Sequence, residues 1–165
     1  MKISNIKLVV ILALSFSVLT SCSKEDDGIY FSEIKDVKVE YSVMELEILD
    51  LVNNHRLSLG LQSLESLSYI SSVAYSHTEY MVETDQVNHD GFPQRQENLV
   101  LKANAKSVGE NVAYGFNSAK GVVNAWLNSS EHRAIIENES YTHFGISIEK
   151  NSEGRFYFTQ MFIKK

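Results

Sequence analysis

The chain has 165 residues and a formal net charge of −6 at pH 7, and 44% of its residues are hydrophobic. The acidic balance argues against nucleic acid as a partner, because binding to phosphates needs a basic surface. The single cysteine, Cys22, excludes an internal disulfide framework. This length and composition are typical of one globular domain with its own apolar core.

The chain begins with a basic and then apolar segment. Lys2 and Lys7 give a positive start, residues 8–19 form an apolar run, and the run closes on Leu-Thr-Ser-Cys at residues 19–22. This arrangement predicts a signal peptide. The run of about 12 residues is shorter than the roughly 20 that a helix needs to span a bilayer, so no permanent transmembrane helix is expected here.

The closing Leu-Thr-Ser-Cys resembles the lipobox of bacterial lipoproteins. The resemblance implies that residues 1–21 are removed and that Cys22 carries lipid chains such as palmitate, which attach the protein to the membrane. The alternative is an ordinary signal peptide with an incidental cysteine. The charged residues 23–27 are interpreted as a solvated tether, and they also resemble the sorting signal of surface lipoproteins. We therefore expect a bacterial outer membrane lipoprotein that is surface-exposed and extracytoplasmic.

These features divide the chain into three parts: a signal peptide at 1–21, a lipidated N-terminus and flexible tether at 22–42, and a folded domain at 43–165. Without residues 1–21, the chain has 13 basic and 21 acidic residues and a net charge of −8. A tether of about 20 flexible residues reaches about 25 Å by random-coil scaling.

The domain is expected to open with two helices. Apolar residues recur at spacings of three and four from Met44 to His55, which predicts a helix that Gly60 ends. The same spacing from Leu67 to Met81 predicts a second helix, which fades at residues 83–85. Between about residues 86 and 107 this pattern is lost, and residues 90–93 carry turn chemistry. We interpret that segment as a long ordered loop, and such loops tend to carry function.

Two further helices and a hairpin follow. Ser118 is expected to cap a third helix that runs through Trp126, and Ser129 or Ser130 to cap a short fourth one. Residues 143–149 and 155–163 alternate in polarity and are rich in aromatic and β-branched residues, which predicts two strands joined by a turn at 151–154. Helices followed by paired antiparallel strands indicate an α+β layered domain.

Six short motifs follow one another from about residue 44 to residue 163. They are Asn54-His-Arg56 with Gly60-Leu61, Ser76-His77 with Tyr80-Met81, Asn88-His89, Gly109-Glu-Asn-Val-Ala113, Trp126 followed by Ser129 and His132-Arg133, and Phe158-Thr-Gln-Met-Phe162. Their order and spacing resemble the CAP superfamily of cysteine-rich secretory proteins, antigen 5 allergens and pathogenesis-related proteins, and in particular its bacterial SCP-like extracellular branch. The resemblance implies a three-layer α-β-α sandwich with a central antiparallel sheet and an open cleft.

The same resemblance implies a set of cleft residues. Family members often carry two histidines and two acids there, and His89 and Glu110 match the first of each. Ser129 stands where the second acid would follow the tryptophan, and Tyr157 stands where the second histidine would precede the Thr-Gln pair. His132 would then point back into the cleft and replace the missing histidine.

Four polar residues near these groups are expected to contact a ligand: Asn88, Asn111, Ser129 and Tyr157.

An imidazole beside a carboxylate admits several kinds of chemistry. His89 and Glu110 would act as a general base, a proton shuttle or half of a metal site. In the structural alternative, Glu110 anchors a loop by accepting backbone N–H bonds, and His89 only pairs with it. His89 and His132 with Glu110 would leave one open position on a divalent ion such as zinc. No His-Glu-x-x-His spacing is present, so no cofactor is expected to be required.

The other candidate residues have structural explanations. Catalysis by Ser129 or Ser130 is less favoured, because the Gly-x-Ser-x-Gly turn is absent and helix capping explains both serines. His55 and His77 fall on apolar helix faces, where a histidine satisfied by one hydrogen bond is more common than a ligand. His143 opens a strand.

Two functional classes remain after these observations. The favoured one is a monomeric binding module, held at the membrane by its N-terminal lipid, whose cleft binds an envelope component, a lipid-like molecule or a host ligand. The other is a hydrolase of peptide or glycan bonds that uses His89, Glu110 and His132. If the segment at 86–107 buried the histidines, catalysis on a polymer would be hard to defend.

Overall fold

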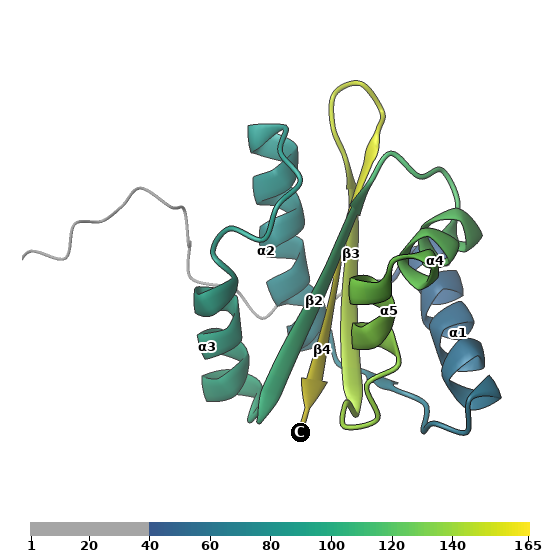
Figure 1. The fold of residues 1–165 in the computed structure, drawn as a ribbon. Helices are drawn as coiled ribbons and strands as arrows, with labels where there is room; N and C mark the ends of the chain where they lie inside the picture. The colour runs from purple at the N-terminus through teal and green to yellow at the C-terminus, as the bar shows by residue number, and fades with distance from the viewer. Residues whose placement is uncertain (1–39) are drawn as a thin grey trace, which may run out of the picture.

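The computed structural model describes residues 40–165 and is drawn in Figure 1. The predicted signal peptide, the predicted lipidation site at Cys22 and most of the predicted tether lie outside the described residues. Within residues 40–165, no helix has both the length and the apolar character needed to cross a membrane.

A four-stranded sheet lies at the centre of the described part, with the strand order β1-β3-β4-β2. The strands β2 (Ser107–Tyr114), β4 (Phe156–Lys164) and β3 (His143–Lys150) pair antiparallel over almost their full lengths. The two-residue strand β1 (Glu65–Ser66) adds a short parallel pairing to β3. The predicted hairpin is therefore confirmed, and the sheet is antiparallel apart from β1.

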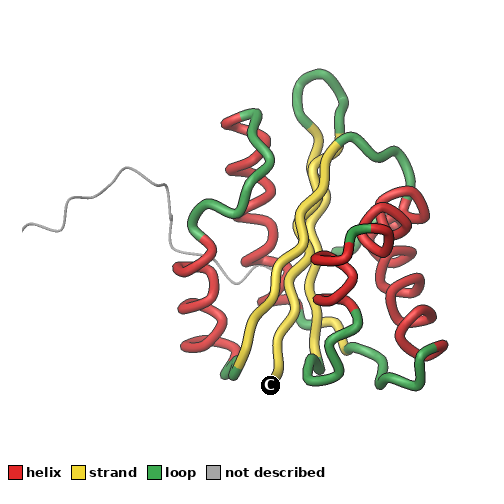
Figure 2. The backbone as a smooth tube through the Cα atoms, in the orientation of Figure 1, coloured by secondary structure: helices red, strands yellow, loops and turns green. Residues whose placement is uncertain are grey.

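Helices cover both faces of this sheet (Figures 1 and 2). One face is covered by α1 (Val43–Ser58), α4 (Ala119–Asn128) and α5 (Ser130–Ile136), and the other by α2 (Ser68–Thr84) and α3 (Phe92–Ala103). The expected three-layer α-β-α sandwich is confirmed.

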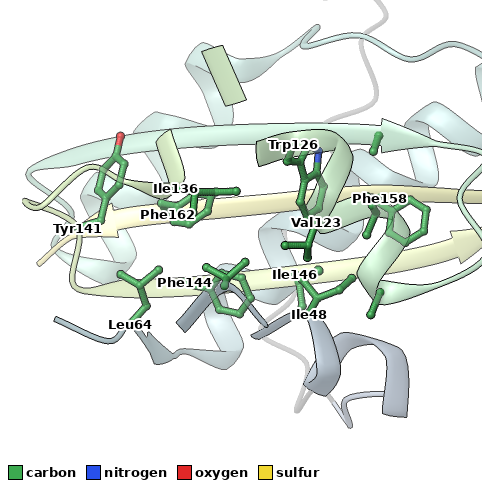
Figure 3. Close-up of a cluster of buried hydrophobic side chains, with 14 residues drawn as sticks. Ile48, Leu64, Val123, Trp126, Ile136, Tyr141, Phe144, Ile146, Phe158 and Phe162 are labelled. Atoms are coloured by element: carbon green, nitrogen blue, oxygen red, sulfur yellow. The ribbon is translucent and has the colours of Figure 1, made fainter. Parts of the chain in front are cut away.

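Each face of the sheet has its own apolar core. Beneath α1, α4 and α5, Trp126, Phe144, Phe158 and Phe162 pack together, each at most 1% exposed (Figure 3). The indole Nε1 of Trp126 donates a hydrogen bond of 3.0 Å to the backbone oxygen of Val112, which fixes α4 to β2.

Local signals explain where most helices begin and end. Ser42 and Glu45 form a capping box at the start of α1, and Gly60 follows the helix with a φ of 76° that suits glycine. Ser118 caps α4 by accepting from the N–H of Gly121. Ser129 occupies the N-cap position of α5, but its side chain makes no capping bond there. Capping by a hydroxyl therefore does not explain Ser129.

The prediction of a long loop over residues 86–107 is wrong, because α3 occupies Phe92–Ala103. The predicted turn is present, but Gly91 is the N-cap residue and Pro93 lies in the first turn, where its missing N–H is harmless. The buried stripe of α3 consists of Arg95, Leu99 and Ala103. Because one member of this stripe is charged, the sequence here lacks the repeated apolar residues, three or four positions apart, that predict a helix.

Candidate functional site

The carboxylate of Glu110 is the centre of the candidate site. Glu110 lies on β2, and its side chain is 2% exposed. From α3, Arg95 donates two hydrogen bonds, Nε to Oε2 at 2.6 Å and Nη2 to Oε1 at 2.7 Å. The Nδ1 of His89 lies 2.8 Å from the same Oε1. An arginine fork of this geometry holds a carboxylate in one fixed orientation.

Arg95 also ties the preceding loop to this carboxylate. It is 1% exposed, and its Nη1 donates a bond of 2.6 Å to the backbone oxygen of Asp90. The expected structural alternative had Glu110 accepting backbone N–H bonds. Instead, the recorded donors to Glu110 are side chains, and the loop is anchored through Arg95.

These contacts keep Glu110 ionised. Burial alone raises the pKa of its carboxyl, but the bonds from His89 and Arg95 and the charge of Arg95 outweigh burial and lower the pKa below its ordinary value. The carboxylate is therefore negative and already occupied on both oxygens.

His89 is the exposed member of this cluster. Its side chain is 51% exposed, and no partner is recorded for Nε2 within residues 40–165. Because an ionised Glu110 only accepts hydrogen bonds, Nδ1 carries the hydrogen in the neutral ring and Nε2 is a free acceptor. The segment at 86–107 therefore does not bury His89.

His77 lies behind this pair. As predicted for a histidine on a helix face, it is buried and makes one hydrogen bond, from Nε2 to the backbone oxygen of Asn88 at 2.8 Å. That Nε2 is also 4.0 Å from Oε1 of Glu110, so His77 belongs to the same cluster. Burial, followed by the charge of Arg95, lowers the pKa of His77 to about 4, which keeps the ring neutral at pH 7.

His132 approaches the site from α5, on the other face of the sheet. It is half-buried; burial and, second, the charge of His89 lower its pKa, so the two imidazoles influence each other. The backbone oxygen of His132 accepts a bond of 3.2 Å from Nδ2 of Asn111. Within residues 40–165, no group of three or more His, Cys, Asp or Glu side chains is arranged so that it could hold a metal ion.

The four predicted contact residues occupy different environments. Asn88 bonds to Gln86 and Asp90 within the loop, and Ser129 is half-buried at the junction of α4 and α5. Asn111 is completely buried, and Tyr157 is 1% exposed with its hydroxyl donating to Asp85. These last two side chains lie in the interior, so they do not form the open wall of the cleft in this conformation.

Sequence reasoning missed Arg95 altogether and assigned His77 to packing alone. Arg95 lies in residues 86–107, where apolar residues do not recur at helical spacing. Only the fold shows that its side chain reaches Glu110. The available signal was the spacing of Arg95, Leu99 and Ala103, which is helical once the arginine is allowed to be buried.

Comparisons with known proteins agree with this fold. The model of a family described as CAP, cysteine-rich secretory protein family, matches residues 49–162. The uncharacterized membrane protein YlbC of Bacillus subtilis (strain 168) is 34% identical over 124 residues, which are 73% of this chain and 34% of that protein.

Two solved structures are similar as well. An outer surface protein from Borrelia burgdorferi has a TM-score of 0.69 and 24% identity, over 77% of this chain and 96% of that chain. An extracellular protein containing an SCP domain, from Bacillus anthracis str. Ames, has a TM-score of 0.64 and 26% identity, over 73% of this chain and 40% of that chain. This chain thus spans about a third of the length of the curated relative that it matches.

Proposed function

We propose that this chain, which belongs to the cysteine-rich secretory protein (CAP) family, is an extracytoplasmic binding module that holds a ligand against His89 and His132. The ligand is an envelope component, a lipid-like molecule or a host molecule. Because Nε2 of His89 is a free acceptor, the ligand presents a hydroxyl or an N–H group to it.

The observation that carries this proposal is that both carboxylate oxygens of Glu110 already accept hydrogen bonds. The fork of Arg95 and the ring of His89 already use both carboxylate oxygens. A carboxylate held in this way orients the imidazole, and its lowered pKa makes it a poor proton acceptor near neutral pH. Ser129 stands where the family resemblance implied a second acid, so the site offers a fixed surface with few groups for proton transfer.

A second candidate function, general-base hydrolysis of peptide or glycan bonds, is favoured by one feature of the same geometry. Glu110 holds Nδ1 of His89 and leaves Nε2 without a recorded partner in residues 40–165, as a general base requires. In this alternative, His89 takes a proton from water and His132 contacts the substrate.

A metal is not required in this proposal. His89 and His132 together offer two imidazoles, whereas a zinc site in proteins uses three or four protein ligands. A divalent ion such as zinc at this place would have to complete its coordination from the ligand. Dialysis against a chelator is therefore expected to leave ligand binding unchanged.

We further propose that a lipid on Cys22 attaches the module to the outer membrane, with the domain exposed at the cell surface. The relatives support an extracytoplasmic location through their names, which describe one as a membrane protein and another as extracellular. The tether of residues 22–42 would allow the cleft to reach a ligand near the membrane surface.

The binding function can be tested with a ¹³C-labelled extract of bacterial envelope lipids and glycan fragments. The full chain is immobilised, and the retained compounds are measured by mass spectrometry. We expect His89→Ala/His132→Ala to lose the retained compound, while His55→Ala, a control whose histidine pairs with Glu137, keeps it. Equal retention by the double variant would refute a ligand site at these histidines.

A further inference from the structure

A concave site lies at the other edge of the sheet from Glu110. A pocket of about 410 Å³ is formed by the start of α1, the start of α2 and the outer side of β3. We call it the edge pocket, and none of His77, His89, Glu110 and His132 lines it. Its volume falls within the range of roughly 300–1,000 Å³ that is usual for small-molecule sites. It is open because β1 pairs with β3 only at His143 and Phe144.

The backbone of β3 offers hydrogen-bond acceptors to this pocket. The N–H of Ile146 donates to Oγ of Ser71, and the N–H of Ile148 donates to Oε1 of Glu45, both at 3.1 Å. In a strand, the N–H and the C=O of one residue point to the same side. The carbonyls of Ile146 and Ile148 therefore also face the open edge, and no donor to either is recorded in the described part of the chain.

The side chains of the pocket add negative charge without a cation. Glu40, Glu45 and Glu149 line it, and no lysine, arginine or histidine of residues 40–165 does. Glu45 is committed to the N–H of Ile148 and to the capping box with Ser42. Neither Glu40 nor Glu149 has a recorded hydrogen bond or ion pair within residues 40–165.

An independent feature of the pocket is the hydroxyl of Ser147. This residue lines the pocket, is 4% exposed, and its Oγ has no hydrogen-bond partner among the described residues. A buried hydroxyl that makes no hydrogen bond is less stable than the same hydroxyl in contact with water. A ligand group that forms a hydrogen bond with it is therefore favoured.

The electrostatics of the pocket favour a cation. Burial and then the charges of Glu45 and Glu79 raise the pKa of Glu149. Nearby, Tyr75 donates to Glu79, and this bond together with burial raises the pKa of Tyr75 to about 12. The part of each pKa shift that comes from neighbouring carboxylates has the sign that negative charge produces, and a bound cation would oppose that part.

The type of cation follows from the spacing of these groups. No three acidic or histidine side chains in residues 40–165 are close enough to share a metal ion. An ammonium group has three N–H donors and no acceptor, which matches a site that presents carboxylate, carbonyl and hydroxyl oxygens. Its alkyl chain would pack against Ile146, Ile148 and the ring of Tyr75.

We propose that the edge pocket binds a primary alkylammonium group. The group donates hydrogen bonds to Glu149, to Ser147 and to the outer carbonyls of β3. This group belongs either to a free diamine or to the lysine side chain of a polypeptide. Lysines of this chain are included, because Lys35 and Lys38 precede the pocket residue Glu40 closely in sequence.

Isothermal titration of the full chain in a non-ionic detergent tests this proposal. The probes are 1,5-diaminopentane, Nα-acetyl-lysine methylamide and, as the uncharged control, pentane-1,5-diol. We expect Glu149→Gln to weaken amine binding about tenfold and Ser147→Ala about threefold, because each substitution removes an acceptor for the charged ammonium group. The matched control Glu97→Gln removes one exposed charge on α3 and is expected to change the affinity less than about twofold.

The probes also separate the sources of the amine. Binding of the diamine alone supports a free diamine, and binding of the lysine derivative supports a polypeptide. Binding that is seen only in Lys35→Gln/Lys38→Gln supports occupation by the chain's own lysine. The proposal is overturned if neither amine binds the wild type or that double variant, if the diol binds as well as the amines, or if Glu149→Gln binds them unchanged.

Discussion

Side chains from the loop before α3, from α3 itself and from α2 converge on the carboxylate of Glu110. His89 and Arg95 bond to it directly, and His77 lies 4.0 Å from it. The carboxylate and the guanidinium are both almost completely buried, so each depends on the other for its charge. Taking one partner away leaves an uncompensated charge in the interior.

Replacing Arg95 alone is therefore expected to destabilise the domain strongly. Arg95→Met leaves the charge of Glu110 buried and should lower the free energy of unfolding by about 3–5 kcal/mol, measured by urea denaturation. Adding Glu110→Met should recover part of this loss, because both charges are then absent. The exposed control Arg133→Met should stay within about 0.5 kcal/mol of the wild type. A loss from Arg95→Met no larger than the control's would contradict the account of this pair.

His77 predicts a specific dependence of stability on pH. Its pKa is about 4 in the folded chain, against an ordinary value of 6.5, so the unfolded chain binds more protons between these pH values. Stability should therefore fall by roughly 3 kcal/mol from this group as the pH decreases from 6.5 to 4. Glu110, whose pKa is also lowered, adds a loss only below its ordinary value of 4.5.

The measurement is urea denaturation at several pH values for the wild type and for His77→Gln, which keeps a donor for the backbone oxygen of Asn88. The difference in stability between the two proteins should shrink as the pH falls from 6.5 to 4. A difference that stays constant over this interval would show that His77 does not titrate as described.

The sequence predicted half of this cluster. The family resemblance joined His89 to Glu110, and the two do lie 2.8 Å apart. Arg95 could not be found in this way, because a buried arginine is recognised only when its acceptor is known. Glu110 lies 15 residues away on another element.

At the scale of elements, four of the five helices in residues 40–165 were predicted, and α3 was not. The residue ranges of α1 and α2 agree with the spacing of their apolar residues, and α4 begins after its capping serine. The sequence pattern predicted neither α3 nor β2. Gly109, Glu110 and Asn111 are all buried, so β2 lacks the alternation of a strand with one solvated face.

The contact of α2 with β3 depends on one glycine. An added Cβ at Gly145 would overlap the backbone nitrogen of Ser71 and lie 2.5 Å from the backbone carbon of Ile70. These are backbone atoms that cannot rotate away, so α2 would have to move. We expect Gly145→Ala to lower the free energy of unfolding by about 1–3 kcal/mol, measured by urea denaturation.

Gly121→Ala is the matched control for this substitution. Gly121 lies inside α4, where alanine is the better helix former by about 1 kcal/mol and the nearest atom is the side-chain oxygen of Ser118 at 3.0 Å. This control should be neutral or stabilising. If Gly145→Ala were as stable as Gly121→Ala, the close packing of α2 on β3 would be wrong.

At the scale of the whole molecule, the three-layer sandwich followed from the family motifs. Local periodicity alone indicated helices and a final hairpin, but it did not say which helices share a face. That arrangement depends on contacts distant in sequence, such as the bond from Trp126 to the backbone of Val112. The sandwich brings the loop of His89 and the helix of His132 to the two sides of β2.

The proposed anchor predicts the behaviour of the complete protein in cells. Cys22→Ser should abolish the uptake of a palmitate analogue and release the protein from the membrane fraction, because two or more acyl chains are needed for stable attachment. Metabolic labelling followed by fractionation measures both. Ser23→Ala is the control and should keep label and membrane attachment. Label that persists in Cys22→Ser would show that the lipid is elsewhere.

Binding and hydrolysis differ most directly in the fate of the molecule that the cleft retains. The full chain is incubated for a day with the ¹³C-labelled envelope extract, and the retained compound and any fragments are quantified by mass spectrometry at intervals. Because Glu110 is held by Arg95 and His89, we predict that the compound stays intact and that its retained amount is constant. Fragments that accumulate with time in the wild type, and not in His89→Ala, would contradict a binding function and establish the hydrolase.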